Sequence, residues 1–158
     1  MKREKKELIR FWNCFFFGLY LLLLVYLMFF SEELGRSMLE GEYHYNLIPF
    51  LEIRRYLRYR RQIGTLRVLW NLAGNVIGFI PFGMMLPVVL RKNIGFWKVC
   101  LLSFELTLFI EISQLVLRVG SCDVDDMILN TLGGCLGYVV YRVMTRLKER
   151  NIEKKEKI

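Results

Sequence analysis

Four long apolar stretches constrain this chain more than any other feature of its sequence. Three of them cover residues 11–30, 68–90 and 95–117, and a shorter fourth runs from 127 to about 144. Each of the first three is close to the roughly 20 residues that an α-helix needs to cross a bilayer. A hydrophobic content of 54% and a mean hydropathy of +0.32 are typical of a surface exposed to lipid. The sequence therefore predicts an all-α membrane protein with four transmembrane helices.

The chain is expected to form a single transmembrane domain over residues 1–158. The first apolar stretch follows a basic start, as in a signal peptide, but it is longer than a signal peptide's apolar region and no Ala-x-Ala-like site follows it. We therefore expect it to be retained as a helix. The expected helices span about 9–31, 67–90, 94–118 and 124–147, followed by a basic, frayed tail at 148–158.

The distribution of basic residues predicts the orientation of the helices. With four spans, both termini lie on one side, and that side carries fifteen Lys and Arg residues against eight on the other. Excess Lys and Arg is typical of cytoplasmic loops, so we expect both termini in the cytoplasm of a bacterial cell. The net charge of +8 is explained by these flanking residues, which meet membrane lipids. We expect no nucleic-acid partner.

The long connection between the first two spans contains a basic segment that allows two interpretations. Phe50, Ile53 and Leu57 recur at helical spacing, while Arg54, Arg58 and Arg61 lie on another face. One interpretation is a short interfacial helix whose arginines face lipid phosphates. The other is a solvated charged segment that only keeps the connection in water. The sequence leaves both open.

Polar residues within three of the apolar stretches all lie toward the same side of the membrane. Spacings of three, four and seven place the members of each group on one helix face. Charged groups at membrane depth cost several kcal/mol unless paired or hydrated, so such a cluster indicates a functional site. We expect it on the side of the 31–67 and 118–126 connections. The groups are Asn71 and Asn75, then Glu111, Gln114 and Arg118, and finally Asp126 and Asn130.

Three carboxylates, Asp123, Asp125 and Asp126, crowd the short connection before the last span. Their oxygen atoms suit Mg²⁺, Mn²⁺ or Ca²⁺, so a divalent metal is one hypothesis, although Asp-x-Asp-Asp is a weak signal. Alternatively, Asp123 is the N-cap of the last helix and Asp126 returns a hydrogen bond to its amide in a capping box. Neither N-cap nor capping box explains Asp125.

Glu111 also allows two interpretations. A carboxyl group buried in the membrane suits a general base or a proton carrier. Alternatively, Glu111 and Arg118 form structural ion pairs, with Arg118 able to reach the aspartates across the turn. Asn71 and Asn75 could likewise serve only as interhelical hydrogen-bonding groups.

Helix packing and cysteine chemistry give weaker signals. Gly74 with Gly78, and Gly133 with Gly137, have the small-x-x-x-small spacing that lets helices approach closely. The cysteines show no Cys-x-x-Cys spacing, so we expect neither a disulfide framework nor a zinc site. They lie at 14, 100, 122 and 135.

Several motifs taken together resemble the VanZ-like family of small bacterial membrane proteins. In chain order they are Asn46-Leu-Ile-Pro-Phe50, Asn71-Leu-Ala-Gly-Asn75 leading into Phe79-Ile-Pro-Phe-Gly83, Glu111-Ile-Ser-Gln114 with Arg118, and Asp123-Val-Asp-Asp126 leading into Asn130-Thr-Leu-Gly-Gly134. The resemblance covers roughly residues 9–147 and implies a cell-envelope protein, because the founding member is associated with teicoplanin resistance without an altered peptidoglycan precursor. The matching positions are Asn75, Glu111, Gln114, Arg118, Asp123, Asp126 and Asn130.

Three classes of function are compatible with these residues. The first binds or shields a lipid-linked envelope component through the external polar cluster, with Asn71, Asn75, Gln114, Arg118, Asp123, Asp125 and Asn130 as ligand-binding residues. The second is an enzyme acting on a lipid headgroup or envelope precursor, with Glu111 and Asp126 as catalytic residues and a possible metal on Asp123, Asp125 and Asp126. The third is a small transporter or a subunit of a membrane complex. The sequence indicates no other cofactor and leaves the oligomeric state open.

Overall fold

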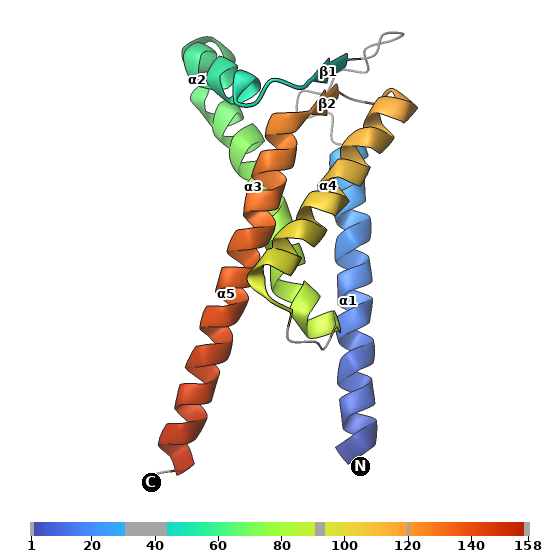
Figure 1. Cartoon of the computed structure of the whole chain (residues 1–158), viewed down its shortest axis with the longest axis vertical. Helices are drawn as coiled ribbons and strands as arrows, with labels where there is room; N and C mark the ends of the chain where they lie inside the picture. Colours follow the sequence, from blue (N-terminus) through green and yellow to red (C-terminus); the bar gives the residue numbers. More distant parts are fainter. Residues whose placement is uncertain (1, 31–43, 91–93, 120, 157–158) are drawn as a thin grey trace.

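The computed structural model describes residues 2–30, 44–90, 94–119 and 121–156. The described residues form five helices and one pair of short strands (Figure 1). In chain order these are α1 (Lys2–Phe30), β1 (His44–Asn46), α2 (Leu51–Ile63), α3 (Thr65–Leu90), α4 (Phe96–Leu117), β2 (Ser121–Asp123) and α5 (Val124–Glu156).

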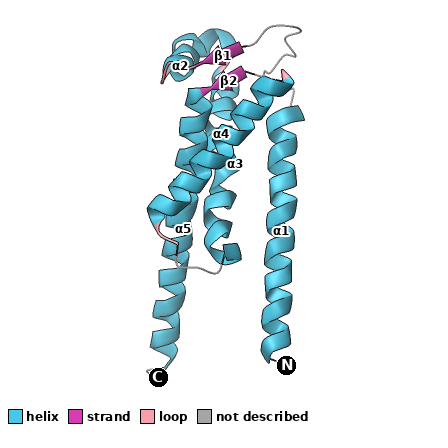
Figure 2. Cartoon of the chain, turned by 45° about the vertical axis from the view of Figure 1, so that its right-hand side comes forward, coloured by secondary structure: helices cyan, strands magenta, loops and turns pink. Residues whose placement is uncertain are grey.

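Four of these helices, α1, α3, α4 and α5, are long and apolar enough to cross a membrane, so the predicted all-α fold with four spans is confirmed. The ends differ from the prediction, because α1 already begins at Lys2 and α5 continues to Glu156. Most of the tail predicted to be frayed is therefore helical. Both termini lie at the same end of the molecule, where α1 and α5 project beyond α3 and α4 (Figures 1 and 2).

The closest helix packing joins α3 to α5, and glycines make it possible. A Cβ atom on Gly133 would overlap the carbonyl oxygen of Val76, and one on Gly137 would overlap that of Ile80. Gly83 approaches the carbonyl of Gly134 in the same way. We call this contact the glycine seam; its glycines are Gly83, Gly133, Gly134 and Gly137.

The two predicted glycine pairs therefore have different roles. Gly133 and Gly137 lie in the seam, as the small-x-x-x-small spacing predicts. A Cβ atom on Gly74 would meet no atom within 4 Å, and one on Gly78 would meet only ordinary side-chain contacts from α1. Gly78 instead accepts a hydrogen bond at its carbonyl from the Tyr20 hydroxyl, at 2.7 Å.

The helix α1 packs less tightly than the other spans. Only 11% of its apolar window is buried, against 33% for each of the other three. Its buried residues, Leu24 and Met28, contact Phe79 of α3 and Ile110 of α4. Phe17, Tyr20 and Leu21 are partly buried against the core, whereas the exposed apolar side chains of α1 are available to lipid acyl chains.

A covalent link that the sequence did not predict joins α4 to α5. Cys100 and Cys135 form a disulfide with a Cα–Cα distance of 5.4 Å. The expectation that the chain lacks disulfides is therefore wrong for this pair. The two residues are 35 positions apart and belong to different helices, so sequence spacing alone did not reveal the pairing.

At the end of the molecule opposite the termini, β1 and β2 pair in parallel beside α2 (Figure 2). The register places Asn46 opposite Asp123. This short pairing brings the connection before α2 against the connection before α5. It thereby holds α2 at the same end of the bundle as the start of α5.

The glycine seam predicts opposite effects for one substitution at two positions. We expect Gly137→Ala to destabilise the protein by about 1–3 kcal/mol, because the new methyl group overlaps the Ile80 carbonyl oxygen. Gly74→Ala, which meets open space, should be neutral or slightly stabilising. Thermal unfolding of both variants in detergent measures the difference, and equal unfolding temperatures would contradict the seam.

Candidate functional site

The start of α5 is organised around Asp123. Its carboxylate oxygen Oδ1 accepts a hydrogen bond from the amide of Asp125 at 2.8 Å, so Asp123 is the N-cap of α5, as predicted. The predicted capping box with Asp126 is wrong. The amide of Asp123 instead donates to Oε2 of Glu111 on α4, at 2.9 Å. Glu111 therefore performs from a neighbouring helix the role that a capping-box acid performs locally.

Asp125, which had no explanation from sequence, caps a different helix. Its Oδ1 accepts the amide of Phe50 and its Oδ2 accepts the amide of Ile53, the latter at 3.0 Å. These amides lie at the N-cap and third positions of α2, where no intrahelical acceptor exists. Phe50 is held in the left-handed conformation at φ 64°, which is unfavourable for a non-glycine residue. One carboxylate of α5 thus fixes the start of α2.

Two amide side chains complete this end of the bundle. Nδ2 of Asn75 on α3 donates to Oδ1 of Asp126. Nδ2 of Asn46 donates to Oδ1 of Asp123 at 3.2 Å, while the Asn46 side-chain oxygen accepts the amide of Ile48. We call these neighbouring residues the polar cluster; it comprises Asn46, Asn75, Glu111, Asp123, Asp125 and Asp126.

Much of the polar cluster is shielded from solvent. Glu111 is 0% exposed, Asp125 1%, Asp123 7% and Asn75 8%, whereas Asp126 is partly exposed. Hydrogen bonds to carboxylates contribute about 1.5–3 kcal/mol each, more than those between neutral groups. The buried members therefore fix the geometry, and Asp126 lies at the accessible edge.

Two predicted residues lie deeper in the bundle, each with its own partner. Nε2 of Gln114 donates to the backbone carbonyl of Met28 on α1, at 2.7 Å. Nδ2 of Asn130 donates to the hydroxyl of Thr107 on α4, at 2.8 Å. Both side chains are fully buried. They tie α4 to α1 and to α5, so the hydrogen bonds give them a packing role beneath the polar cluster.

The other predicted residues lie outside the polar cluster. Asn71 donates to the carbonyl of Arg67 on its own helix, at 3.0 Å, in an exposed hydrogen bond. Arg118 is exposed and ends α4 in the left-handed conformation, at φ 57°. Glu105, an acid near the middle of α4 that was not assigned to the site, is also exposed. A ligand-binding role for Asn71 and Arg118 stays a prediction.

The three aspartates are not arranged as a metal site. Among the described residues, no group of three or more His, Cys, Asp or Glu side chains could hold a metal ion. Each aspartate instead accepts hydrogen bonds from a different amide group: Asp123 from Asn46, Asp125 from the backbone of α2, and Asp126 from Asn75. The metal hypothesis for these residues therefore gains no support from the geometry.

Burial and neighbouring acids shift several titrations where α2 covers the cluster. Burial, followed by repulsion from Asp126, Asp125 and Glu52, raises the pKa of Asp123 from 3.8 to about 6, although the Asp125 amide opposes the shift. Burial also raises the pKa of Glu52, against the attraction of Arg55, whose guanidinium is 2.8 Å away. The pKa of the Tyr56 hydroxyl rises through burial and the nearby acids. The clustered acids of this region therefore favour binding of hydrogen-bond donors and of cations.

Several participants were not predicted from the sequence. Asn46 stands in a recognised motif but had no assigned role, and its side-chain bond to Ile48 is an Asx turn, a local pattern that sequence can reveal. Glu52 follows the start of α2, where an acid suits the helix dipole. Thr107 lies four residues before Glu111 on α4, which predicts the same face.

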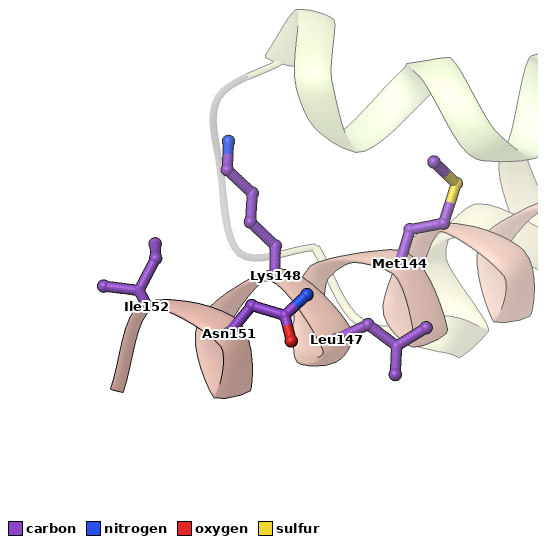
Figure 3. Close-up of a pocket in the computed structure, with 5 residues that line it drawn as sticks. All are labelled: Met144, Leu147, Lys148, Asn151 and Ile152. Carbon is purple, nitrogen blue, oxygen red and sulfur yellow. The ribbon is translucent and has the colours of Figure 1, made fainter. Parts of the chain in front are cut away.

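A hollow of about 380 Å³ lies far from the polar cluster, near the end of α5. Its walls are the side chains of one helix, which spread along the helix without enclosing a space (Figure 3). We therefore do not treat it as the functional site. The lining residues are Met144, Leu147, Lys148, Asn151 and Ile152.

Four membrane-spanning helices and a hydrogen-bonded acidic cluster at one end define a multi-pass membrane protein with a polar site at the membrane boundary. The VanZ/LLP1 family model matches residues 17–145, and the chain belongs to this family. It is 35% identical over 127 residues to protein VanZ of Enterococcus faecium, covering 78% of this chain and 70% of that protein. No solved structure matches the chain. The relationship supports a membrane protein of the teicoplanin-resistance type.

The capping role of Asp125 predicts a local effect of its removal. In Asp125→Ala, the amides of Phe50 and Ile53 lose their acceptor. The substitution should destabilise the first turn of α2 by about 0.5–2 kcal/mol, so that this turn opens more often. Hydrogen exchange of residues 50–54 should accelerate. Asp126→Ala, which removes a neighbouring charge but not the cap, is the matched control. Equal exchange in both variants would refute the assignment.

The raised pKa of Asp123 predicts a pH dependence of stability. The folded state binds this proton more tightly than the unfolded chain. The resulting stabilisation is complete below pH 3.8 and is lost as the pH rises through about 6. We expect the unfolding temperature of the wild type to fall more over this interval than that of Asp123→Asn. Parallel pH profiles would show that Asp123 titrates normally.

Proposed function

We propose that the polar cluster binds the headgroup of a lipid-linked cell-envelope component and shields it from a glycopeptide such as teicoplanin. The observation that carries this proposal is the convergence of acids and amides from three spans and both connections at one end of the bundle. A membrane protein rarely gathers ionisable groups without a functional use. The family relationship supplies the link to teicoplanin.

The chemistry of the cluster indicates what a ligand would offer. Asp126 lies at its partly exposed edge, near the partly exposed Glu52 of α2, which pairs with Arg55. Carboxylates accept hydrogen bonds from ammonium, amide or hydroxyl groups. Asn75 holds Asp126 from α3. The fully buried Glu111 accepts the amide of Asp123 at the start of the same helix, α5. An envelope headgroup rich in amide and hydroxyl donors fits this arrangement.

The proposal requires the polar cluster to face the outside of the cell. Because both termini lie at the opposite end, this is the orientation in which the termini are cytoplasmic (Figure 1). The excess of Lys and Arg on the terminal side supports it. A cluster at the outer surface meets the same components that a glycopeptide must reach.

The enzyme hypothesis has less support. A general base must come within hydrogen-bond reach of the proton that it removes. Glu111 is 0% exposed and accepts the amide of Asp123, which suits a positioning role. Asp126 is partly exposed but is held by Asn75. Binding therefore accounts for more of the observed hydrogen bonds than catalysis does.

Two asparagines one turn apart provide a matched test of the proposal. Asn75→Ala removes the donor to Asp126, whereas Asn71→Ala removes only a bond within α3. We expect native mass spectrometry of protein extracted from bacterial membranes to show a lipid-linked adduct that Asn75→Ala loses and Asn71→Ala keeps. Teicoplanin inhibitory concentrations of cells expressing each variant should change in parallel.

Two results would contradict the proposal. One is the absence of any envelope adduct from the wild type. The other is equal adduct and equal inhibitory concentration in both variants at matched expression. Either result would leave the polar cluster with a purely structural role.

A further inference from the structure

The interfacial helix α2 has two chemically different faces. Its partly buried face turns toward the polar cluster, whereas its outer face carries exposed arginines. Spacings of four and three keep these arginines on one side of the helix. We call Arg54, Arg58 and Arg61 the arginine stripe; the inner face consists of Glu52, Ile53, Tyr56 and Ile63.

The arginine stripe has unused binding capacity. Arg55 pairs with Glu52, but within the described part of the chain no carboxylate pairs with Arg54, Arg58 or Arg61. Rotation of α2 cannot easily bring them to an internal acid, because Asp125 holds its first turn through two amides. A fixed row of guanidinium groups is therefore presented outward.

The short connection between α2 and α3 determines the level of the arginine stripe relative to the membrane. Only Gly64 separates α2 from α3, which spans the membrane. On the first turns of α3, Leu66 is 79% exposed and Trp70 65%, so these apolar side chains meet lipid. Tryptophan is enriched at the level of the headgroups. We therefore expect the arginine stripe to lie at the level of the phosphates of the adjacent leaflet.

We propose that the arginine stripe binds the phosphate of an anionic phospholipid in the leaflet that contains α2. Guanidinium groups form paired, charge-assisted hydrogen bonds with phosphate oxygens, and three of them in a row complement an anionic headgroup. Exposed Leu57 beside the stripe favours a lipid over a soluble anion, because it offers contact to an acyl chain. This binding is independent of the ligand proposed for the polar cluster.

Trp70 provides a local reporter of this binding. The chain has three tryptophans, of which Trp12 lies in the first half of α1 and Trp97 in the first turn of α4, both away from α2. The double substitution Trp12→Phe, Trp97→Phe therefore leaves Trp70 alone. In vesicles containing brominated phosphatidylglycerol or brominated phosphatidylcholine, quenching of Trp70 reports which lipid lies next to it. We expect a clear preference for phosphatidylglycerol.

Substitution of the stripe tests its role directly. In Arg54→Gln, Arg58→Gln, Arg61→Gln, the relative affinity for phosphatidylglycerol should fall roughly fivefold for each arginine removed, equivalent to about 1 kcal/mol each. The matched control is Arg146→Gln, Lys148→Gln, Arg150→Gln, which removes the same charge from the end of α5 and should leave the preference unchanged. Circular dichroism checks that α2 stays helical in both.

Three outcomes would contradict the proposal. Equal quenching by the two lipids in the wild type would show that anionic lipid is not enriched at α2. Equal loss in the stripe variant and the control would assign the preference to overall charge. Displacement by inorganic phosphate beyond the effect of sodium chloride at the same ionic strength would show that the stripe binds soluble phosphate. None of these results depends on the envelope adduct.

Discussion

The hydrogen bond from the amide of Asp123 to Glu111 is the contact on which the rest of the site depends. Helix starts leave amides without acceptors, and near lipid an unsatisfied amide costs several kcal/mol. Glu111 satisfies the amide of Asp123, Asp123 satisfies that of Asp125, and Asp125 satisfies two amides of α2. A buried acid of α4 therefore helps to determine, through two aspartates, where α2 lies.

Much of this arrangement could be predicted from sequence. Apolar length predicted the four spans, and antiparallel order placed Asn75, Glu111 and the aspartates at one end. The N-cap role of Asp123 follows from local chemistry, because the cap and its amide are two residues apart. The spacing of Gly133 and Gly137 predicted close packing in α5, although not its partner helix.

The remaining contacts depend on how distant segments meet, which periodicity does not specify. Asp125 is 75 residues from Phe50, and the pairing of β1 with β2 brings the two connections together. Asn71 and Asn75 share a spacing, yet Asn75 alone reaches α5. The choice between Asp126 and Glu111 as the acceptor for the Asp123 amide required the position of α4, which a local motif cannot supply.

The glycine seam also limits how the bundle can rearrange. Where the backbones of α3 and α5 pack directly against each other, no flexible side chains can accommodate sliding of one helix past the other, so we expect the two helices to move as one unit. The Cys100–Cys135 bond attaches α4 to this unit. Among the described residues, α1 has neither a glycine seam nor a disulfide, and it is held by the Tyr20–Gly78 and Gln114–Met28 hydrogen bonds and by a small apolar contact. If one span separates from the others within the bilayer, we expect it to be α1, because its separation breaks two hydrogen bonds and a small apolar contact but no backbone seam and no covalent bond.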